Sequence, residues 1–388
     1  MTTTIQQAVR PLFITCFIIG LGVYPLKESR PKCIIYLSFL YSLTAWFIFW
    51  YFLYYLISPH SLISLYRTYN MIIVTGINII VVIMSVILNI CYDKRFQIFM
   101  KKLAAVDNTL EELGTSKIYL KIHMLSKKVI IAWITCSLIL NFYDTLWWLN
   151  KGETSFWIYI LPHLINHFIH INIFMDSIFI IFLWYINNRF DKINEHMKYL
   201  LVKEQHGLRN KWKKPVITVY RYTDNYERVL WSLMQLHLEL CCIARELNEM
   251  FGMQMVLEMA SYLFYVTSLC HYAYGMLLQK VQEEASITAW FGNFLWSFIF
   301  ILRLCAINYF CETVSVKANK TSKIIDQLTG NLRYAKIRKE LYQFTLQIMH
   351  RPLKFTGMGL FYFGNNFVQK FCMRFVTFII IILQMSGN

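Results

Sequence analysis

Seven long apolar stretches, separated by segments that carry most of the charge, constrain the fold of this chain more than any other feature. Each stretch approaches or exceeds the about 20 residues that a helix needs to cross a hydrocarbon core about 30 Å thick. The composition agrees, because 57% of the 388 residues are hydrophobic and only 15% are charged. We therefore predict an all-α membrane protein, a single domain over 1–388, with seven transmembrane helices at 33–57, 71–90, 129–149, 156–186, 251–278, 286–310 and 366–385.

Lysine and arginine fall almost entirely in alternate loops. The other three loops contain one such residue each, against 32 in the segments 1–32, 91–128, 187–250 and 311–354. Because cytoplasmic loops carry the excess of positive charge, we expect a cytoplasmic N-terminus and, after seven spans, an extracellular C-terminus. The same bias explains the net charge of +16, so the chain is expected to meet membrane lipid and no nucleic acid.

A further apolar stretch at 11–26 could pass for a signal peptide. Cleavage after it would place the new N-terminus outside and reverse every loop against its charge. We therefore expect an amphipathic or re-entrant segment at the inner face, within the cytoplasmic N-terminal segment 1–32.

Helical periodicity continues outside the predicted membrane spans. Apolar residues recur three or four positions apart from Val229 to Phe251, which indicates a helix that runs directly into the fifth span. A similar pattern between Val314 and Ile348 predicts a helical hairpin that returns the chain to the membrane. The segments 187–250 and 311–354 are thus predicted to be cytoplasmic helical extensions.

Polar residues gather in the predicted outer halves of the third, fourth and fifth spans. His163, His167 and His170 are spaced i, i+4 and i+7, so one continuous helix would place them on a common face. A metal site, an aqueous pocket and hydrogen-bonded interior histidines are all compatible with that spacing. The candidate ligand pocket, with aromatic walls and few polar groups, comprises these three histidines and Asp144, Trp147, Trp148, Asn166, His271 and Tyr272.

Two opposite charges lie within neighbouring spans, Glu258 in the fifth and Arg303 in the sixth. An unpaired charge at such depth costs about 3 kcal/mol or more, so we expect these two residues to form a structural ion pair, with a gating role as the alternative. The sequence contains no GxSxG, HExxH or glycine-rich phosphate loop, and its ten cysteines form no CxxC pair. Neither an enzyme nor a cofactor is predicted.

The C-terminal "TFIIIILQM", residues 377–385, resembles the signature of insect gustatory receptors, which is Thr-Tyr, five hydrophobic residues and Gln-Phe. Thr377, the five residues 379–383 and Gln384 match it, whereas Phe378 and Met385 replace the two aromatic positions. The segments "HRPLKFTGMGLF" at 350–361 and "LGVYPL" at 21–26 are also similar to that family.

The resemblance implies a ligand-gated, non-selective cation channel in the plasma membrane of a gustatory neuron. Its tetramer, homomeric or heteromeric, would surround one pore with four copies of the seventh helix (366–385), and each subunit would bind a small tastant, a sugar or bitter compound. Candidate pore and gate residues are Thr377, Phe378, Ile380, Leu383 and Gln384. Ile380 and Leu383 would form a hydrophobic constriction, and Gln384 would meet hydrated cations.

Other functions remain open at this point. The run before Gln384 could face lipid and end in an interfacial amide. An insect odorant receptor subunit would share the architecture but need a co-receptor, and a G-protein-coupled receptor would have the opposite orientation. A secondary transporter is disfavoured because no paired, Gly/Pro-broken helices appear in two related halves.

Overall fold

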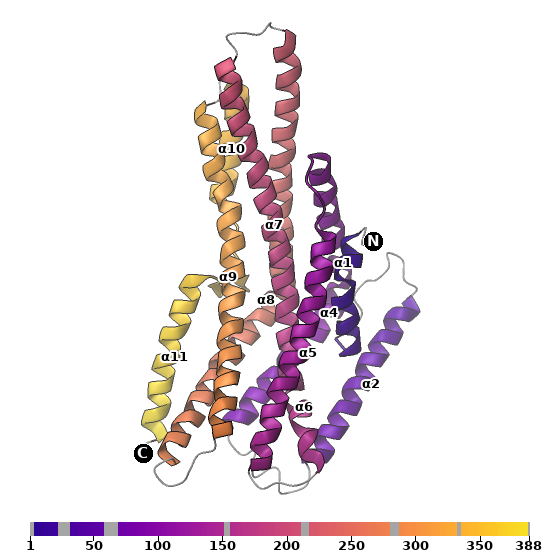
Figure 1. The fold of residues 1–388 in the computed structure, drawn as a ribbon, viewed down its shortest axis with the longest axis vertical. Helices are drawn as coiled ribbons and strands as arrows, with labels where there is room; N and C mark the ends of the chain where they lie inside the picture. Colours follow the sequence, from indigo (N-terminus) through magenta and orange to yellow (C-terminus); the bar gives the residue numbers. More distant parts are fainter. Residues whose placement is uncertain are drawn as a thin grey trace.

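The computed structural model describes residues 4–21, 32–57, 69–150, 156–210, 217–279, 287–331 and 335–386, which are almost entirely helical (Figure 1). The elements in chain order are α1 (Ile5–Ile18), α2 (Lys32–Ile57), α4 (Tyr69–Glu112), α5 (Tyr119–Asn150), the 3-10 turn η1 (Phe156–Tyr159), α6 (Leu161–Ile165), α7 (His167–Asn210), α8 (Ile217–Gln279), α9 (Ile287–Asn331), α10 (Ala335–His350), β1 (Thr356–Gly357), β2 (Phe361–Tyr362) and α11 (Asn365–Ser386). The helical class predicted from the sequence is confirmed.

Three helical segments among the described residues are long and apolar enough to cross a membrane. They are Tyr119–Leu149, His167–Leu200 and Trp290–Gln327, in α5, α7 and α9. Two parts of α4, Gly76–Asn89 and Cys91–Glu112, meet at a bend of 62° and make a fourth when taken together. The count of seven spans and the orientation of the termini stay predictions.

The fourth apolar stretch, predicted as one helix from 156, is broken. The chain first forms η1, then the single-turn helix α6, and starts the long α7 only at His167. Pro162 lies in the first turn of α6, and proline has no N–H to donate to a preceding turn. Pro162 therefore favours a helix start at this point, and a second interruption follows at Asn166, between α6 and α7.

Long helices carry the fold well past the apolar segments. The helix predicted from Val229 into the fifth stretch is present as part of the 63-residue α8, and the predicted hairpin is formed by α9 and α10. In Figure 1, α7, α8 and α9 rise together beside α10. We call this the extension end, and we call the opposite end, where α5 stops and α9 begins, the far end.

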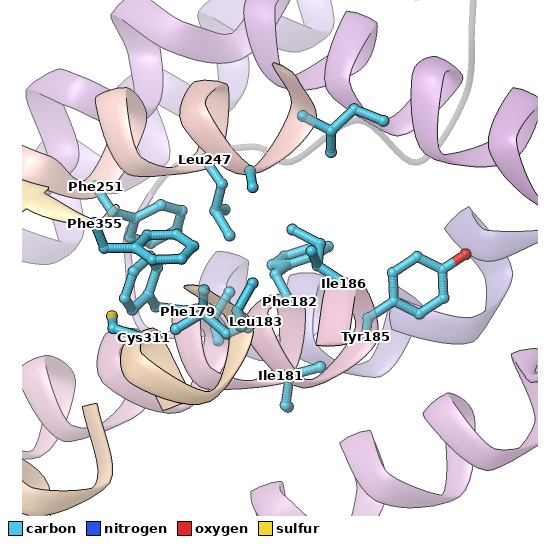
Figure 2. Close-up of a cluster of buried hydrophobic side chains, with 14 of the residues drawn as sticks. Phe179, Ile181, Phe182, Leu183, Tyr185, Ile186, Leu247, Phe251, Cys311 and Phe355 are labelled. Atoms are coloured by element: carbon cyan, nitrogen blue, oxygen red, sulfur yellow. The ribbon is translucent and has the colours of Figure 1, made fainter. Parts of the chain in front are cut away.

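Aromatic side chains fill the junction between α7, α8, α9 and the segment before β1 (Figure 2). Phe179 of α7 lies 5.2 Å from the ring of Phe251 on α8, while Phe355 is 1% exposed beside them. Burying a phenylalanine contributes about 1.5–3 kcal/mol, so this cluster fixes α7, α8 and α9 against one another.

The N-terminal helix α1 overlaps the predicted segment 11–26, of which residues 22–26 lie outside the described part of the chain. Its buried residues recur at helical spacing and pack on α4 and α5: Ile5, Ala8, Val9, Leu12, Phe13 and Cys16. Side chains of Tyr41, Trp46 and Asn89 donate hydrogen bonds to the carbonyls of residues 18, 20 and 21, just past its last turn. The end of α1 is thereby tied to α2 and α4.

A two-stranded hairpin and a glycine lead the chain into α11. Thr356 of β1 pairs with Tyr362 of β2, and both the backbone N–H and the side chain of Thr356 bond to Asn248 on α8. Gly364 follows with φ +138°, and its N–H donates to Asn308 Oδ1 on α9 (2.9 Å). The start of α11 is therefore anchored on both long helices.

Candidate functional site

A hydrogen-bonded polar network lies at the far end, where α5, α6, α7 and α9 meet. The side-chain amide of Asn166, at the break between α6 and α7, donates to Asp144 Oδ2 (2.6 Å) and to Asn141 Oδ1 (3.0 Å) on α5. The indole N–H of Trp296 on α9 donates to Asp144 Oδ1 (3.1 Å). Asp144 and Asn166, predicted from the sequence as pocket residues, are thus brought together.

Two of the predicted histidines extend this network. The Nδ2 of Asn141 lies 2.9 Å from His163 Nδ1, and His170 Nε2 lies 3.2 Å from Asn141 Oδ1. Since the amide nitrogen can only donate and the amide oxygen can only accept, His163 accepts at Nδ1 and His170 donates at Nε2. Asn141 is thereby the centre of the network, linking α5 to both sides of the break.

The three histidines do not share one helical face, which corrects the prediction from their spacing. The break at Asn166 separates His163 on α6 from His167 and His170 on α7. His167 turns toward α2, where its ring stacks on Phe49 at a centroid distance of 4.8 Å. Among the described residues, no group of three or more His, Cys, Asp or Glu side chains is placed to hold a metal ion.

Aromatic rings surround the network on the α8 and α9 side. Trp296 stacks on His170 at 6.1 Å and is followed by Phe300, which stacks on Tyr265 of α8 at 3.9 Å. Trp296 is 5% exposed and Phe300 1%. The site therefore has a polar side on α5 to α7 and an aromatic side on α8 and α9, which suits a small organic ligand.

The other predicted pocket residues lie at the edge of this site or outside the described side chains. Trp148 is buried in a separate small cluster with Ile158 and Leu161, and Trp147 packs against that cluster. The side chains of His271 and Tyr272 lie outside the described part of the chain. Sequence reasoning missed Asn141, Tyr265 and Trp296, although each is a polar or aromatic residue in an apolar stretch.

A buried ion pair lies deeper, between α7 and α9. Arg303 bonds Asp176 through Nε and Nη2, both at 2.7 Å from Oδ2, and the Tyr262 hydroxyl donates to the same oxygen (2.6 Å). The predicted pair of Arg303 with Glu258 is wrong, because the carboxylate of α7 takes that position. Glu258 instead accepts from Gln254 (2.9 Å) and lies beside Tyr262. Asp176 was identifiable as a carboxylate within the fourth apolar stretch.

The helix α11 presents two different faces. Phe367, Phe371 and Phe375, four residues apart, pack toward the core. Thr377, Ile380 and Gln384, three and four residues apart, are exposed on the opposite face. The side chains of the other candidate pore residues, Phe378 and Leu383, lie outside the described part of the chain.

A groove of about 820 Å³ runs beside α11, between it and helices α8 and α9. Lys370 and Arg374 of α11 line it together with Lys354 and Glu312. On the helical wheel Arg374 lies between the packed face and the exposed face of α11, whereas Lys370, seven residues before Thr377, lies on the same side as Thr377 and Gln384. Only the charge of Arg374 is therefore offset from the line of Thr377, Ile380 and Gln384.

An almost entirely helical chain with several membrane-length apolar helices, and a polar network walled by aromatic rings among them, is typical of a multi-pass helical membrane protein. A family model for the 7tm chemosensory receptors matches residues 9–386. The chain therefore belongs to the chemosensory receptor family that includes the insect gustatory and odorant receptors, and the resemblance noted at its C-terminus is confirmed.

Individual relatives match over part of the chain. Gustatory receptor 28b of Drosophila melanogaster is 27% identical over 170 residues, which are 43% of this chain and 36% of the relative. Gustatory receptor 39b of the same species is 26% identical over 158 residues, 41% of this chain and 42% of the relative. These alignments cover less than half of each relative, so activity and ligands are not transferred with them.

Solved structures match over nearly the whole chain. The insect olfactory receptor OR5 from Machilis hrabei superposes with a TM-score of 0.55 at 14% identity, covering 97% of both chains. The complex of that receptor with eugenol gives a TM-score of 0.54 at 14% identity. At this identity the similarity establishes the fold alone.

Proposed function

We propose that this chain is a subunit of a ligand-gated, non-selective cation channel that detects small tastants at the plasma membrane of a gustatory neuron. Ligand binds at the polar network of the far end, and α11 lines the pore in a homo- or heterotetramer. The C-terminus lies outside, as the charge distribution favours. Family membership and the eugenol complex of the olfactory receptor support a small-molecule ligand.

The observation that carries this proposal is the exposed face of α11. A single copy leaves Ile380 half exposed, together with Thr377 and Gln384 in line with it, while the phenylalanines of the opposite face hold the helix to its own subunit. Four such faces around an axis form a passage with an apolar ring at Ile380, which gates by excluding water, and an amide ring at Gln384.

Cysteine accessibility tests the proposal directly. The variants Thr377→Cys, Ile380→Cys and Gln384→Cys are made with Cys372→Ser, because Cys372 is itself exposed on α11. Currents evoked by sugars, amines and bitter alkaloids are recorded while a charged thiol reagent is applied. We expect block at all three positions, faster when ligand is present.

Phe375→Cys is the matched control, because this residue packs on its own subunit within the same helix. Block at Phe375 with none at the other three positions would place the pore elsewhere. An exposed face that contacts lipid, the alternative for the run before Gln384, predicts that the reagent leaves the current unchanged at every position.

An odorant receptor subunit is the second candidate, favoured by the fold shared with an insect olfactory receptor. Such a subunit would be silent alone and active with a co-receptor. A tag after Asn388, stained on intact cells, distinguishes both channel types from a G-protein-coupled receptor, for which the tag would be reached only after permeabilisation.

A further inference from the structure

The carboxylate of Asp144 is the terminal acceptor of the polar network. Every hydrogen bond that reaches it comes from a neutral donor, the amide of Asn166 or the indole of Trp296. Further along the network, the amide oxygen of Asn141 accepts from Asn166 and His170, and its amide nitrogen donates to His163, whose Nδ1 therefore carries no proton. The two carboxylate oxygens of Asp144 thus accept hydrogen bonds from neutral groups only, among the described residues.

Among the described side chains, no lysine or arginine forms an ion pair with Asp144. Arg303 lies on α9 two turns after Trp296, but it forms its ion pair with Asp176. The third histidine, His167, stacks on Phe49 rather than turning to the network. A carboxylate without a cation in an apolar region costs several kcal/mol of desolvation free energy. A cationic ligand that binds beside the carboxylate is attracted to it and offsets part of this cost.

The surroundings of Asp144 suit an organic cation. Asp144 is half-buried as a residue, and the ring of Trp296 that donates to its carboxylate belongs to the aromatic side of the site. Asn293, one turn before Trp296 on α9, has an amide oxygen without a hydrogen-bond partner among the described residues, and that oxygen can accept from an ammonium N–H.

We propose that Asp144 anchors a protonated or quaternary amine, so that the ligands of this chain are organic ammonium compounds rather than neutral sugars. This inference rests on the proposed function, because it uses the same site. The ammonium group meets the carboxylate of Asp144 beside the edge of Trp296, and in a protonated amine an N–H of the ligand also reaches Asn293. The amides of Asn141 and Asn166 hold Asp144 in place.

Binding to the purified, detergent-solubilised full chain tests this without requiring a current. The probes are two matched pairs, choline with 3,3-dimethyl-1-butanol and phenethylamine with 2-phenylethanol, together with glucose. The readout is the midpoint of thermal unfolding against probe concentration, which reports affinity because ligand stabilises the folded state. We expect a rise for at least one ammonium compound and about tenfold weaker binding, or none, for its neutral partner and for glucose.

Asp144→Asn keeps the shape of the side chain and removes its charge, so it should weaken ammonium binding by about tenfold or more. The control Asp191→Asn makes the same change at the extension end, where Asp191 pairs with Lys317, and should bind as the original chain does. If Asp144→Asn does not fold, the matched pairs on the unmodified chain still decide the question.

Three results would overturn the inference: equal stabilisation by an ammonium compound and its neutral partner, no stabilisation by either ammonium compound, or unchanged ammonium binding in Asp144→Asn. Failure of the channel proposal looks different. Ammonium binding that depends on Asp144 without any current would leave the inference standing, whereas currents evoked by glucose alone would leave the channel and remove the ammonium ligand.

Discussion

At the scale of single residues, the buried charges of α7 and α9 determine which substitutions the apolar region tolerates. The side chains of Arg303 and Asp176 are 7% and 3% exposed, and the guanidinium also lies 4.7 Å above the Tyr262 ring. The free-energy cost of desolvating both ions is offset only while they are paired. The pair therefore stabilises the fold mainly because neither charge is left buried without a partner. The tyrosine binds to both partners and fixes their geometry.

Removing one partner is expected to be far more harmful than removing both. Asp176→Asn should lower the free energy of unfolding by about 3–5 kcal/mol because it isolates Arg303, whereas the double variant Asp176→Asn with Arg303→Met should recover a large part of this loss. Thermal unfolding in detergent measures the effect. In contrast, Asp191→Asn removes a half-exposed pair and should cost at most about 1 kcal/mol. Additive losses in the double variant would contradict the pairing.

At the scale of elements, α9 connects the candidate ligand site to α11, the proposed pore helix. It carries Trp296 in the polar network, then Arg303 in the buried ion pair, and then Asn308, which accepts from the N–H of Gly364 at the start of α11. A continuous α-helix resists bending over such a length, so a shift of α9 at the ligand site would be transmitted to the anchor of α11.

Gly364→Ala tests this anchor. The φ of +138° lies in a region that side-chain-bearing residues avoid, so we expect a cost of about 1–3 kcal/mol and a displaced α11. The current evoked at saturating ligand should fall, and thiol access at Gln384→Cys should change. The control Gly359→Ala is also at positive φ (+77°) but lies in the hairpin turn, in open surroundings. It should leave gating unchanged, and an equal effect of both variants would contradict the role of the anchor.

At the scale of the whole molecule, the main hydrophobic core continues into the extension end, where it surrounds a buried histidine. His237 of α8 lies 3.0 Å from the carbonyl of Ala318 on α9, between the rings of Phe190 from α7 and Phe344 from α10. Burial lowers its pKa to about 4, although the carbonyl of Ala318 opposes the shift and the charge of Arg245 adds to it. The neutral imidazole thus joins four helices.

The stability of this core should decrease in mild acid. Because the pKa of His237 is lower in the folded state than its ordinary value of 6.5, the unfolded state binds the proton first. Its contribution is complete above about pH 6.5 and is lost as the pH falls toward 4, at up to about 1.4 kcal/mol per pH unit. His237→Gln keeps a donor for Ala318 without titrating, so its unfolding midpoint between pH 7.5 and pH 5 should vary less than that of the original chain. Equal slopes would exclude His237 as the cause.

Much of the helical framework could be predicted because hydrophobicity and periodicity are local properties of the sequence. The pattern of Val229 to Phe251 predicted a helix that passes from the extension into the apolar region, and α8 confirms it. The prediction of one continuous helix for the fourth apolar stretch was wrong, because its apolar length was given more weight than Pro162. Burial favours a long helix there, but the missing N–H of the proline interrupts it before α6, and a second interruption follows at Asn166.

The candidate site was predicted in its residue types but not in its pairings. The sequence by itself determined that Asp144, Asn166 and the histidines lie in apolar stretches and that buried charges must find partners, because both follow from the cost of desolvation. Only the tertiary structure decided that Asn141 and Trp296 complete the network and that Arg303 pairs with Asp176 instead of Glu258. The reason is physical: depth along a helix can be counted from the sequence, whereas the rotation of each helix, which selects the facing side chain, is set by packing against all its neighbours.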